Sequence, residues 1–319
     1  MREDEFSRKT NEIVERVSEY YVGSEELVRK ILGSGLSNGN VLFEDFPGLG
    51  KTLLAKIFAR SIGAEFTRVQ FTPDLLPADI TGTKVLRNGR FVIEKGPIFT
   101  NVLLADEINR SPPKTQAALL EAMEERQVTI EGETFSLPSP FFVLATQNPV
   151  EQEGTYPLPE AQIDRFLIRL IPGYPESTDD EIEILYRRIK WKRDDPTSDV
   201  VPAVSLAEFS RMQEAVENVY VDPKILKYIA ELVRKTRDHE MVELGASPRG
   251  GLALLKMSRA MALMDGRGYV IPDDVKGVAY ECLAHRIILK LEYEIEGIRA
   301  EEVVRDALNS VEVPKGDWV

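Results

Sequence analysis

The sequence predicts an α/β fold: a mostly parallel sheet with helices between its strands, followed by a small all-α domain. Up to about residue 195, short apolar runs typical of buried strands alternate with segments whose apolar residues recur at helical spacing. Beyond residue 200 the helical spacing continues, and we expect no further strand. The expected domains are therefore residues 1–195 and residues 200–319, with a linker at Asp194–Ser198 between them.

Composition and charge describe an acidic globular protein. The chain has 319 residues, of which 43% are hydrophobic and 29% charged, as in an ordinary folded protein. Its net charge of -13 opposes binding of nucleic acid through the overall electrostatic field. The basic cluster Arg187–Arg193 is interpreted as the solvated end of a helix, where the helix dipole favours cations.

The cysteine and histidine counts exclude two kinds of site. Cys282 is the only cysteine, so no internal disulfide can form, and we expect it to fill an apolar core position. With only His239 and His285 beside it, the chain lacks the ligands of a structural zinc site. The acidic amino terminus leads into no apolar signal segment, and no run of about 18 apolar residues follows. We therefore expect a cytoplasmic protein with no membrane span.

The first elements are expected to be two helices. A surface helix covers residues 6–19, and a second helix runs from Glu25 to Leu32 with Ser24 as its N-cap. A Gly/Ser/Asn turn over residues 33–39 then leads into the first strand.

Two hairpins are expected as insertions in the α/β pattern. Asn88-Gly89 and Glu131-Gly132 each lie between apolar flanks, so we expect one hairpin over residues 82–95 and another around residues 128–137. A helix is expected to begin with Ser111 as cap and Pro112 at its first position. The other expected strands are 65–71, 101–105, 141–145 and 165–170, and a connecting helix is expected over 174–193.

The segment Val41–Thr52 is predicted to bind phosphate. An apolar run is followed by a Pro/Gly turn and then by a helix. Gly48 and Gly50 let backbone N–H groups converge on an anion at the start of that helix. Lys51 can reach the outer phosphates of a nucleotide, and the Thr52 hydroxyl can bind Mg²⁺. The predicted nucleotide-binding residues of this loop are Asp45, Phe46, Pro47, Gly48, Leu49, Gly50, Lys51, Thr52 and Leu53.

Asp45 departs from the usual phosphate-binding pattern, which has glycine at this position. Aspartate enters the left-handed backbone region more readily than most residues, so the loop can still form. Its carboxylate would lie near the phosphates. If it repels them, Asp45→Gly should tighten nucleotide binding; if it instead organises the loop through a side-chain hydrogen bond, Asp45→Gly should weaken binding. A strand-to-helix turn with an incidental Gly-Lys-Thr sequence is the alternative interpretation.

A second motif completes the pattern of a nucleotide triphosphatase. The apolar run Asn101–Ala105 ends in Asp106 and Glu107, and the carboxyl ends of parallel strands form the sheet edge where ligands bind. Asp106 can hold Mg²⁺, and Glu107 can polarise the water that attacks the γ-phosphate of ATP. Two acids at a strand end are weak evidence alone but strong evidence beside a phosphate loop.

Together these motifs resemble those of the AAA+ ATPases, and specifically of the MoxR branch. The resemblance spans nearly the whole chain, with only the extreme termini outside it. Its long middle segments, Leu103–Gln116 and Ala145–Phe166, are highly specific, and the other two segments are Glu44–Thr52 and Gly245–Arg249. The resemblance implies a P-loop AAA+ core with hairpin insertions and a small helical lid domain.

The resemblance also implies roles for individual residues. Asn148 looks like sensor 1, Arg165 like the arginine finger offered to a neighbouring subunit, and Arg249 like sensor 2. With Lys51 and Glu107, these residues would act in the hydrolysis of ATP with Mg²⁺. The segment that resembles the lining of the adenine pocket consists of Tyr21, Val22 and Gly23.

Members of this branch generally form rings, typically hexamers, and act as chaperone-like remodellers that mature or activate other proteins. The resemblance therefore implies a homo-oligomer and a protein client, with a von Willebrand A domain protein as a frequent partner. The Asp-x-Ser-x-Ser metal motif of such a domain is absent from this sequence, so that partner would be a separate chain. Nucleic acid is not an expected partner.

Some of these roles have alternative interpretations. Asn148 could cap the turn that follows it, and Arg165 could form a surface ion pair with Asp164 or Glu160. Arg249 lies in the expected first turn of a helix, where the dipole disfavours a cation unless an anion binds there. For the function, a nucleotide-gated scaffold with negligible turnover and a DNA-linked AAA+ motor are the alternatives.

Overall fold

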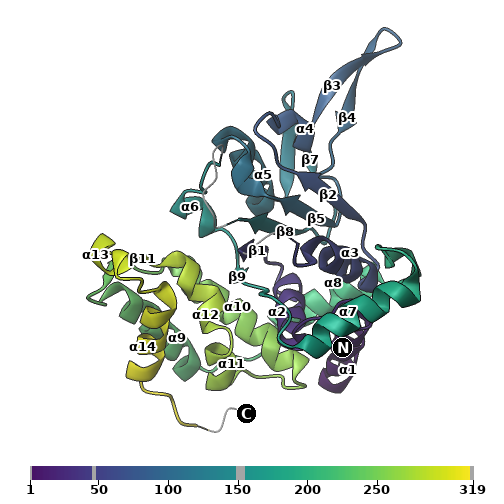
Figure 1. The fold of residues 1–319 in the computed structure, drawn as a ribbon. Coiled ribbons are helices and arrows are strands. Elements are labelled where there is room, and N and C mark those ends of the chain that lie inside the picture. The colour runs from purple at the N-terminus through teal and green to yellow at the C-terminus, as the bar shows by residue number, and fades with distance from the viewer. Residues whose placement is uncertain (1, 45–47, 149–154, 317–319) are drawn as a thin grey trace.

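The computed structural model describes residues 2–44, 48–148 and 155–316 (Figure 1). Three residues of the predicted phosphate loop, Asp45, Phe46 and Pro47, lie outside the described residues. Within the described part, the predicted α/β fold with a mainly helical region after residue 200 is confirmed.

Among the described residues, the central sheet has five parallel strands. They are β1 (Val41–Glu44), β2 (Phe66–Gln70), β5 (Val102–Asp106), β8 (Phe142–Gln147) and β9 (Ile168–Leu170). Their order across the sheet is β2-β5-β8-β1-β9. The register pairs Gln70 with Asp106 and Glu44 with Gln147, so the polar residues that end these strands lie along one edge of the sheet.

Side chains of the strands alternate between two buried clusters, one on each face of the sheet. In β1, Val41 and Phe43 belong to the cluster that includes the first helices, whereas Leu42 belongs to the cluster under the helix that follows β5. Burial on both faces explains why the strands are continuous apolar runs in the sequence. The helices of this part are α1 (Glu3–Ser18), α2 (Glu25–Leu36), α3 (Lys51–Ser61), α4 (Pro77–Thr81), α5 (Pro113–Glu125), α6 (Glu160–Ile163), α7 (Thr178–Trp191) and the 3-10 turn η1 (Ile108–Arg110).

The predicted turn over residues 33–39 is wrong in its first half, because α2 continues to Leu36. The two glycines in this turn of helix allow close packing. A Cβ atom on Gly33 would lie 3.2 Å from Met257 Cε, and one on Gly35 would lie 3.3 Å from Phe209 Cζ. Tertiary packing against the helices after residue 200 therefore overrides the low helix propensity of glycine here.

Both predicted hairpins are present. The first consists of β3 (Gly82–Arg87) and β4 (Arg90–Lys95), and Asn88 and Gly89 at its tip have φ values of 50° and 74°. Positive φ at both central residues is the geometry of the tight hairpin turn that Asn-Gly favours. This hairpin extends away from the rest of the molecule (Figure 1). The second consists of β6 (Gln127–Ile130) and β7 (Glu133–Ser136).

The region after residue 200 is mainly helical, but the prediction that it contains no strand is wrong. Two short antiparallel strands, β10 (Val242–Leu244) and β11 (Ile288–Leu289), pair within it. Such short segments carry no alternation that could be detected in the sequence. The short turn η2 (Thr197–Asp199) precedes this region, and its helices are α8 (Leu206–Glu217), α9 (Pro223–Arg237), α10 (Pro248–Met264), α11 (Pro272–Lys276), α12 (Ala279–Leu283), η3 (Ala284–Arg286), α13 (Leu291–Ile295) and α14 (Ala300–Ser310).

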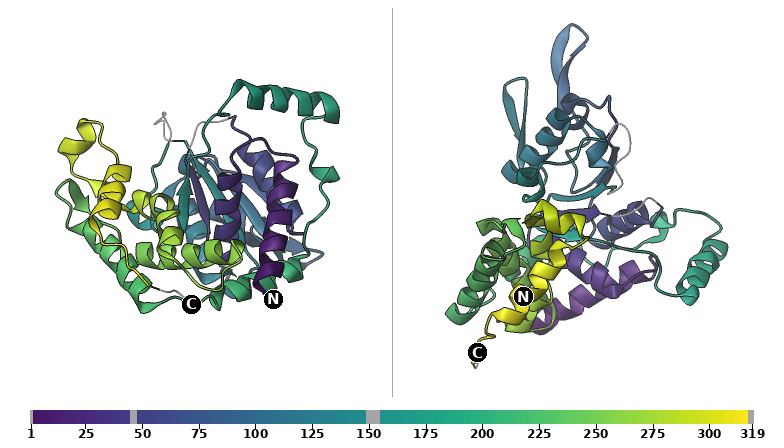
Figure 2. Two further views of the ribbon diagram at one scale, coloured as in Figure 1. Left: turned by 90° about the horizontal axis from the view of Figure 1, so that it is seen from below. Right: turned by 60° about the vertical axis from the view of Figure 1, so that its left-hand side comes forward.

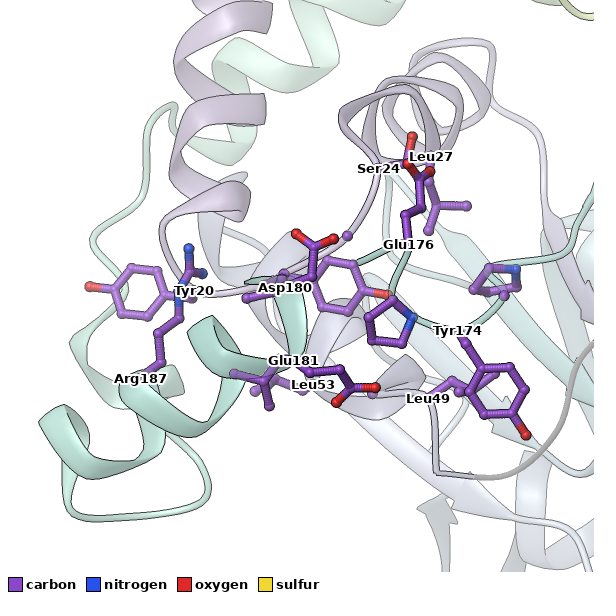
Figure 3. Close-up of a pocket in the computed structure, with 18 of the residues that line it drawn as sticks. Tyr20, Ser24, Leu27, Leu49, Leu53, Tyr174, Glu176, Asp180, Glu181 and Arg187 are labelled. Atoms are coloured by element: carbon purple, nitrogen blue, oxygen red, sulfur yellow. The ribbon is translucent and has the colours of Figure 1, made fainter. Parts of the chain in front are cut away.

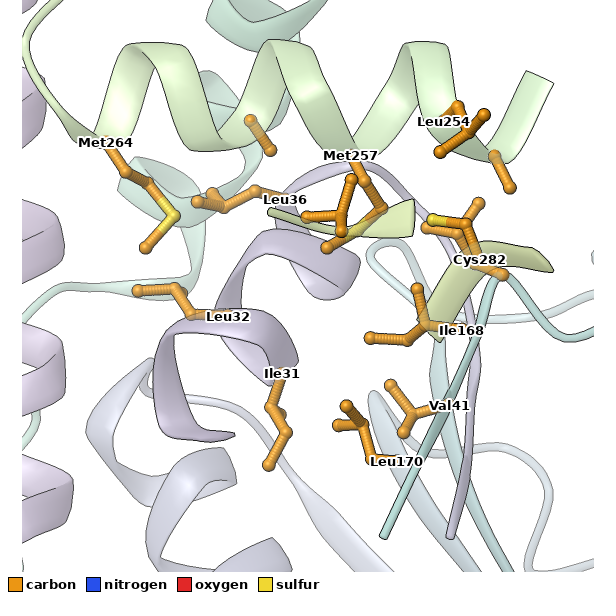
Figure 4. Packing of buried hydrophobic residues seen from close by; sticks show 14 of the residues in the cluster. Ile31, Leu32, Leu36, Val41, Ile168, Leu170, Leu254, Met257, Met264 and Cys282 are labelled. Carbon is orange, nitrogen blue, oxygen red and sulfur yellow. The ribbon is translucent and has the colours of Figure 1, made fainter. Parts of the chain in front are cut away.

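One buried cluster joins the sheet to the helical region. It brings together Leu32 of α2, Met257 of α10, Ile168 of β9 and Cys282 of α12 (Figure 4). The predicted core position of Cys282 is confirmed, since its side chain is fully buried and this burial raises the pKa of the thiol. This cluster contains side chains from both sides of the predicted boundary. The division into residues 1–195 and 200–319 stays a prediction.

Candidate functional site

The described part of the phosphate loop lines a cleft at the carboxyl edge of the sheet. Gly48 and Gly50 have φ values of 89° and 74°, which glycine adopts without strain, and α3 begins directly afterwards at Lys51. The cleft has a volume of about 390 Å³. Its lining residues are Gly48, Leu49, Gly50, Lys51, Thr52, Leu53, Arg68, Gln70, Asp106, Glu107, Thr146, Gln147 and Asn148.

One threonine is hydrogen-bonded to both strand-end acids. The Thr146 hydroxyl accepts a hydrogen bond from the backbone N–H of Glu107 at 2.8 Å and donates one to Asp106 Oδ1 at 2.6 Å. Thr146 is 3% exposed. Glu107 has a φ of 55°, uncommon for glutamate, and the bond to its N–H fixes this conformation. Thr146 therefore links β8 to both acids at the end of β5.

Three further polar side chains contact the acids. Arg68 Nη2 lies 2.7 Å from Asp106 Oδ2, so both oxygens of this carboxylate have partners. Gln70 Nε2 and Arg110 Nη1 lie 2.7 Å and 3.0 Å from Glu107 Oε2. Thr146, Arg68 and Gln70 are not among the site residues that the sequence motifs predict.

A second cavity, of about 710 Å³, adjoins the cleft and shares Gly48, Leu49, Gly50 and Leu53 with it (Figure 3). The predicted adenine-pocket residues Tyr21, Val22 and Gly23 all line this cavity. A Cβ atom on Gly23 would lie 2.5 Å from Tyr21 Cε1, so a larger residue here would have to displace the Tyr21 ring. A Cβ atom on Gly50 would lie 3.3 Å from the other side of the same ring. The Tyr21 side chain is therefore packed between the two segments.

The residues around the two joined spaces fit a magnesium nucleotide. The loop offers backbone N–H groups and a lysine for phosphate, and the neighbouring cavity is lined partly by apolar and aromatic groups that suit a base. The Thr52 hydroxyl and the Asp106 carboxylate are oxygen ligands of the kind that Mg²⁺ prefers. Among the described residues, no group of three or more His, Cys, Asp or Glu could hold a metal. A magnesium ion here would therefore need phosphate oxygens and water to complete its coordination.

Asn148 lines the cleft beside the acids, as expected of a residue that follows β8. Its backbone oxygen accepts a hydrogen bond from Asn109 Nδ2 at 3.1 Å, and Asn109 itself is buried. The turn after β8 is thus tied to the segment that follows Glu107. The alternative role of Asn148, capping the next turn, falls on residues outside the described part.

Arg165 and Arg249 lie together, but away from the cleft. Both line a third cavity of about 360 Å³, and neither is among the lining residues of the other two. Arg165 Nη1 lies 2.6 Å from Glu124 Oε2, and Arg249 contacts the other oxygen of the same carboxylate. Glu124, in α5, is therefore the partner of Arg165, rather than Asp164 or Glu160.

The two arginines are positioned by a shared anchor, Asp164. Its carboxylate accepts hydrogen bonds from Ser247 Oγ at 2.9 Å and from Arg286 Nε at 2.9 Å. Ser247 also caps α10 by accepting from the N–H of Arg249 at 3.1 Å, as predicted. Arg286 is buried and donates further bonds to backbone oxygens, one of them 3.3 Å away at Leu167. The turn that carries Arg165 is thus tied to the helical region.

The basic cluster near the end of α7 is paired with acids. Arg187 Nε lies 2.6 Å from Glu183 Oε1, and Arg188 and Arg193 form ion pairs with acids that follow the helix. Trp191 stacks on Tyr20 with ring centroids 5.9 Å apart. These contacts agree with the interpretation of the cluster as a helix end.

None of the described helices is long and apolar enough to cross a bilayer.

Comparison with known proteins defines the class. Residues 40–168 match the model of the ATPase family associated with various cellular activities (AAA), and residues 234–307 match that of the AAA lid domain. The fold matches a crystal structure from Cytophaga hutchinsonii with a TM-score of 0.91 at 40% identity, covering 98% of this chain and 97% of that one. The fold is therefore that of an AAA+ ATPase with a lid.

Two relatives specify the family. The chain is 49% identical to the uncharacterized protein YeaC of Bacillus subtilis over 303 residues, which are 94% of this chain and 93% of the relative. It is 45% identical to the chaperone MoxR1 of Mycobacterium tuberculosis over 310 residues, 94% of this chain and 81% of the relative. The chain belongs to the MoxR family of AAA+ ATPases.

Proposed function

We propose that this protein binds and hydrolyses ATP with Mg²⁺ and uses the energy to remodel, mature or activate partner proteins. The proposal rests chiefly on the cleft in which Lys51 and Thr52 of the phosphate loop face Asp106 and Glu107 at the end of β5. A phosphate-binding loop opposite two acids is the arrangement that phosphoryl transfer to water requires.

Five residues of the cleft have proposed tasks. When bound, MgATP supplies the phosphoanhydride bond that breaks and a metal that neutralises the phosphate charge. Lys51 holds the outer phosphates, and Thr52 and Asp106 bind the metal. Glu107 accepts the proton of a water whose oxygen bonds to the γ-phosphorus as the bond to ADP breaks. Asn148, beside them, orients that water or the γ-phosphate.

Arg165 and Arg249 are proposed to act on the ATP of a neighbouring subunit. They lie on another face, away from the cleft of their own chain, and share one carboxylate, that of Glu124. A cation pair of this kind stabilises the negative charge of a phosphoryl transition state. Glu124 would hold both side chains until a neighbour's phosphates replace it. This arrangement needs a head-to-tail ring, which we propose to be a hexamer.

The proposed client is another protein, because the relative of Mycobacterium tuberculosis carries the name of a chaperone. A separate protein with a von Willebrand A domain is a proposed partner, and the cytoplasm is the proposed location. The net charge of -13 supports a protein client over nucleic acid.

Mixing two inactive variants tests the shared site. Arg165→Ala subunits keep a working phosphate loop, and Lys51→Ala subunits keep a working arginine finger. An arginine finger contributes roughly 10³ to 10⁵ in turnover, so each variant alone should be nearly inactive. Mixed and allowed to exchange, they should form some interfaces with both halves intact, and part of the wild-type ATPase activity should return. Mixed assemblies that are confirmed by mass and still inactive would contradict a site shared between subunits.

A further inference from the structure

Helix α7 exposes its apolar side to solvent. Ile182, Leu185, Tyr186 and Ile189 recur at the i, i+3, i+4, i+7 spacing of one helical stripe and are 56%, 65%, 58% and 72% exposed. All residues of α7 are described, and none of them is buried. The helix stands apart from the other helices (Figure 2). An amphipathic helix ordinarily turns such a stripe toward a core.

The opposite side of α7 faces its own subunit. Asp180, Ile184, Arg187 and Trp191 line the 710 Å³ cavity beside the phosphate loop. Figure 3 shows Asp180, Glu181 and Arg187 directed toward that cavity. At 3.6 residues per turn, this stripe lies on the other side of the helix from the apolar one. This side of α7 therefore lines the cavity beside the phosphate loop, while the apolar stripe points away from it.

We propose that the apolar stripe of α7, defined by Ile182, Leu185, Tyr186 and Ile189, binds a second copy of this chain. The copy in question is the ring neighbour that brings Arg165 to the cleft, so this inference rests on the proposed function. Since α7 and the phosphate loop line one cavity, a neighbour that reaches the loop also comes within range of α7.

Charge and position support a second copy of the chain as the binding partner of the stripe. The cavity with Arg165 and Arg249 has five basic lining residues and two acidic ones, whereas the cavity under α7 has four acidic and one basic. Opposite charges on two different faces favour a head-to-tail contact between copies. Leu252, in α10 one turn after Arg249, is 56% exposed and offers an apolar contact on the basic face. In Figure 1, α6 and α7 lie on different sides of the sheet.

The first test replaces two residues of the stripe, Leu185→Lys with Ile189→Lys. Neither residue lines a cavity of the nucleotide site, so the variant should fold and, as a monomer, bind a fluorescent ATP analogue with wild-type affinity. Losing two buried side chains should raise the concentration for half-assembly roughly 100-fold. The matched control, Tyr220→Lys with Leu226→Lys, changes two exposed apolar residues elsewhere, 52% and 44% exposed, and should assemble like wild type.

Sedimentation velocity with ATP over a range of protein concentrations measures assembly, and phosphate release measures turnover. A stripe variant that assembles at wild-type concentrations, or a wild-type chain that stays monomeric at all concentrations, would overturn the inference. A wild-type chain that assembles through the stripe but releases no phosphate would instead refute the proposed ATPase and leave the inference standing. The two failures are therefore distinguishable.

A dye attached to the stripe distinguishes contact with a neighbouring subunit from contact with the same subunit. The native Cys282 is fully buried, so an Ile189→Cys variant presents one accessible thiol for an environment-sensitive dye. Dye emission should shift to the blue with rising protein concentration in step with assembly. A blue shift on ATP addition that is independent of protein concentration would mean that α7 folds back on its own subunit, which would overturn the proposal.

Discussion

Thr146→Val should release both acids of the cleft at once. The substitution keeps the shape of the side chain but removes a neutral bond from the Glu107 N–H and a bond to the charged Asp106 carboxylate. The first is worth about 1 kcal/mol and the second about 1.5–3 kcal/mol, giving roughly 2.5–4 kcal/mol in total. Thr146→Ser keeps the hydroxyl and loses one buried methyl group, which costs only about 1 kcal/mol.

Hydrogen exchange at the Glu107 amide measures this difference locally, without assuming that the whole chain unfolds in one step. In Thr146→Val the exchange should accelerate roughly 10²- to 10³-fold, since each 1.4 kcal/mol is a factor of ten. In Thr146→Ser it should change by less than about tenfold. Equal exchange in the two variants, or wild-type exchange in Thr146→Val, would refute the assignment of Thr146 as the anchor of both acids.

Three further predictions concern the cleft and the acid stability of the fold. Lys51→Ala should lose ATP affinity, whereas Glu107→Gln should keep it and lose roughly 10² to 10⁴ in turnover; equal affinities measured by titration would contradict these roles. Arg68→Gln should lower the Mg²⁺ concentration for half-maximal turnover by up to roughly fivefold, because this exposed arginine competes with the metal for the Asp106 carboxylate. A higher Mg²⁺ requirement would argue that Arg68 binds phosphate. The pKa of Glu208 is lowered from 4.5 to about 2, chiefly by the hydrogen bond that Lys9 donates to it. The ionised Glu208 therefore contributes fully to the stability of the fold above pH 4.5, and this contribution disappears toward pH 2. Glu208→Gln should flatten that loss in urea titrations at a series of pH values, and an unchanged pH profile would contradict the pair.

The parts of the fold that follow from local chemistry were predictable. The Asn88-Gly89 turn, the cap of α10 at Ser247 and the burial of Cys282 each depend on a few neighbouring residues or on composition. The end of α2 was not predictable, because Gly33 continues the helix only where Met257 packs against it from a distant part of the chain.

The site divides in the same way. Lys51, Asp106 and Glu107 are found from motifs whose residue types match the chemistry of phosphate and water. Thr146 could not be singled out, since threonine is common at strand ends and its bonds depend on the pairing of β5 with β8. One signal existed: adjacent parallel strands that end in polar residues bring those residues together. The register that decides which of them meet is a property of the sheet.

Glu124 is a second residue, after Thr146, whose contacts could not be predicted from the sequence. It lies near the end of α5 among other acids, and nothing in its neighbourhood in sequence indicates a partner. Only the folded chain brings Arg165 and Arg249 to its two oxygens. The predicted trans role of Arg165 therefore came from a resemblance, whereas its present partner comes from the structure.

In the proposed ring, the anchoring of Asp164 would have a consequence for timing. The carboxylate is held by Ser247 and Arg286, both in the helical region, so the turn with Arg165 should follow that region rather than the sheet when the two move. If nucleotide shifts the helices of one subunit, the same shift would displace the arginine that is proposed to reach the next subunit. The state of one subunit would then affect the next subunit in one direction round the ring, and successive subunits would hydrolyse ATP in sequence instead of independently.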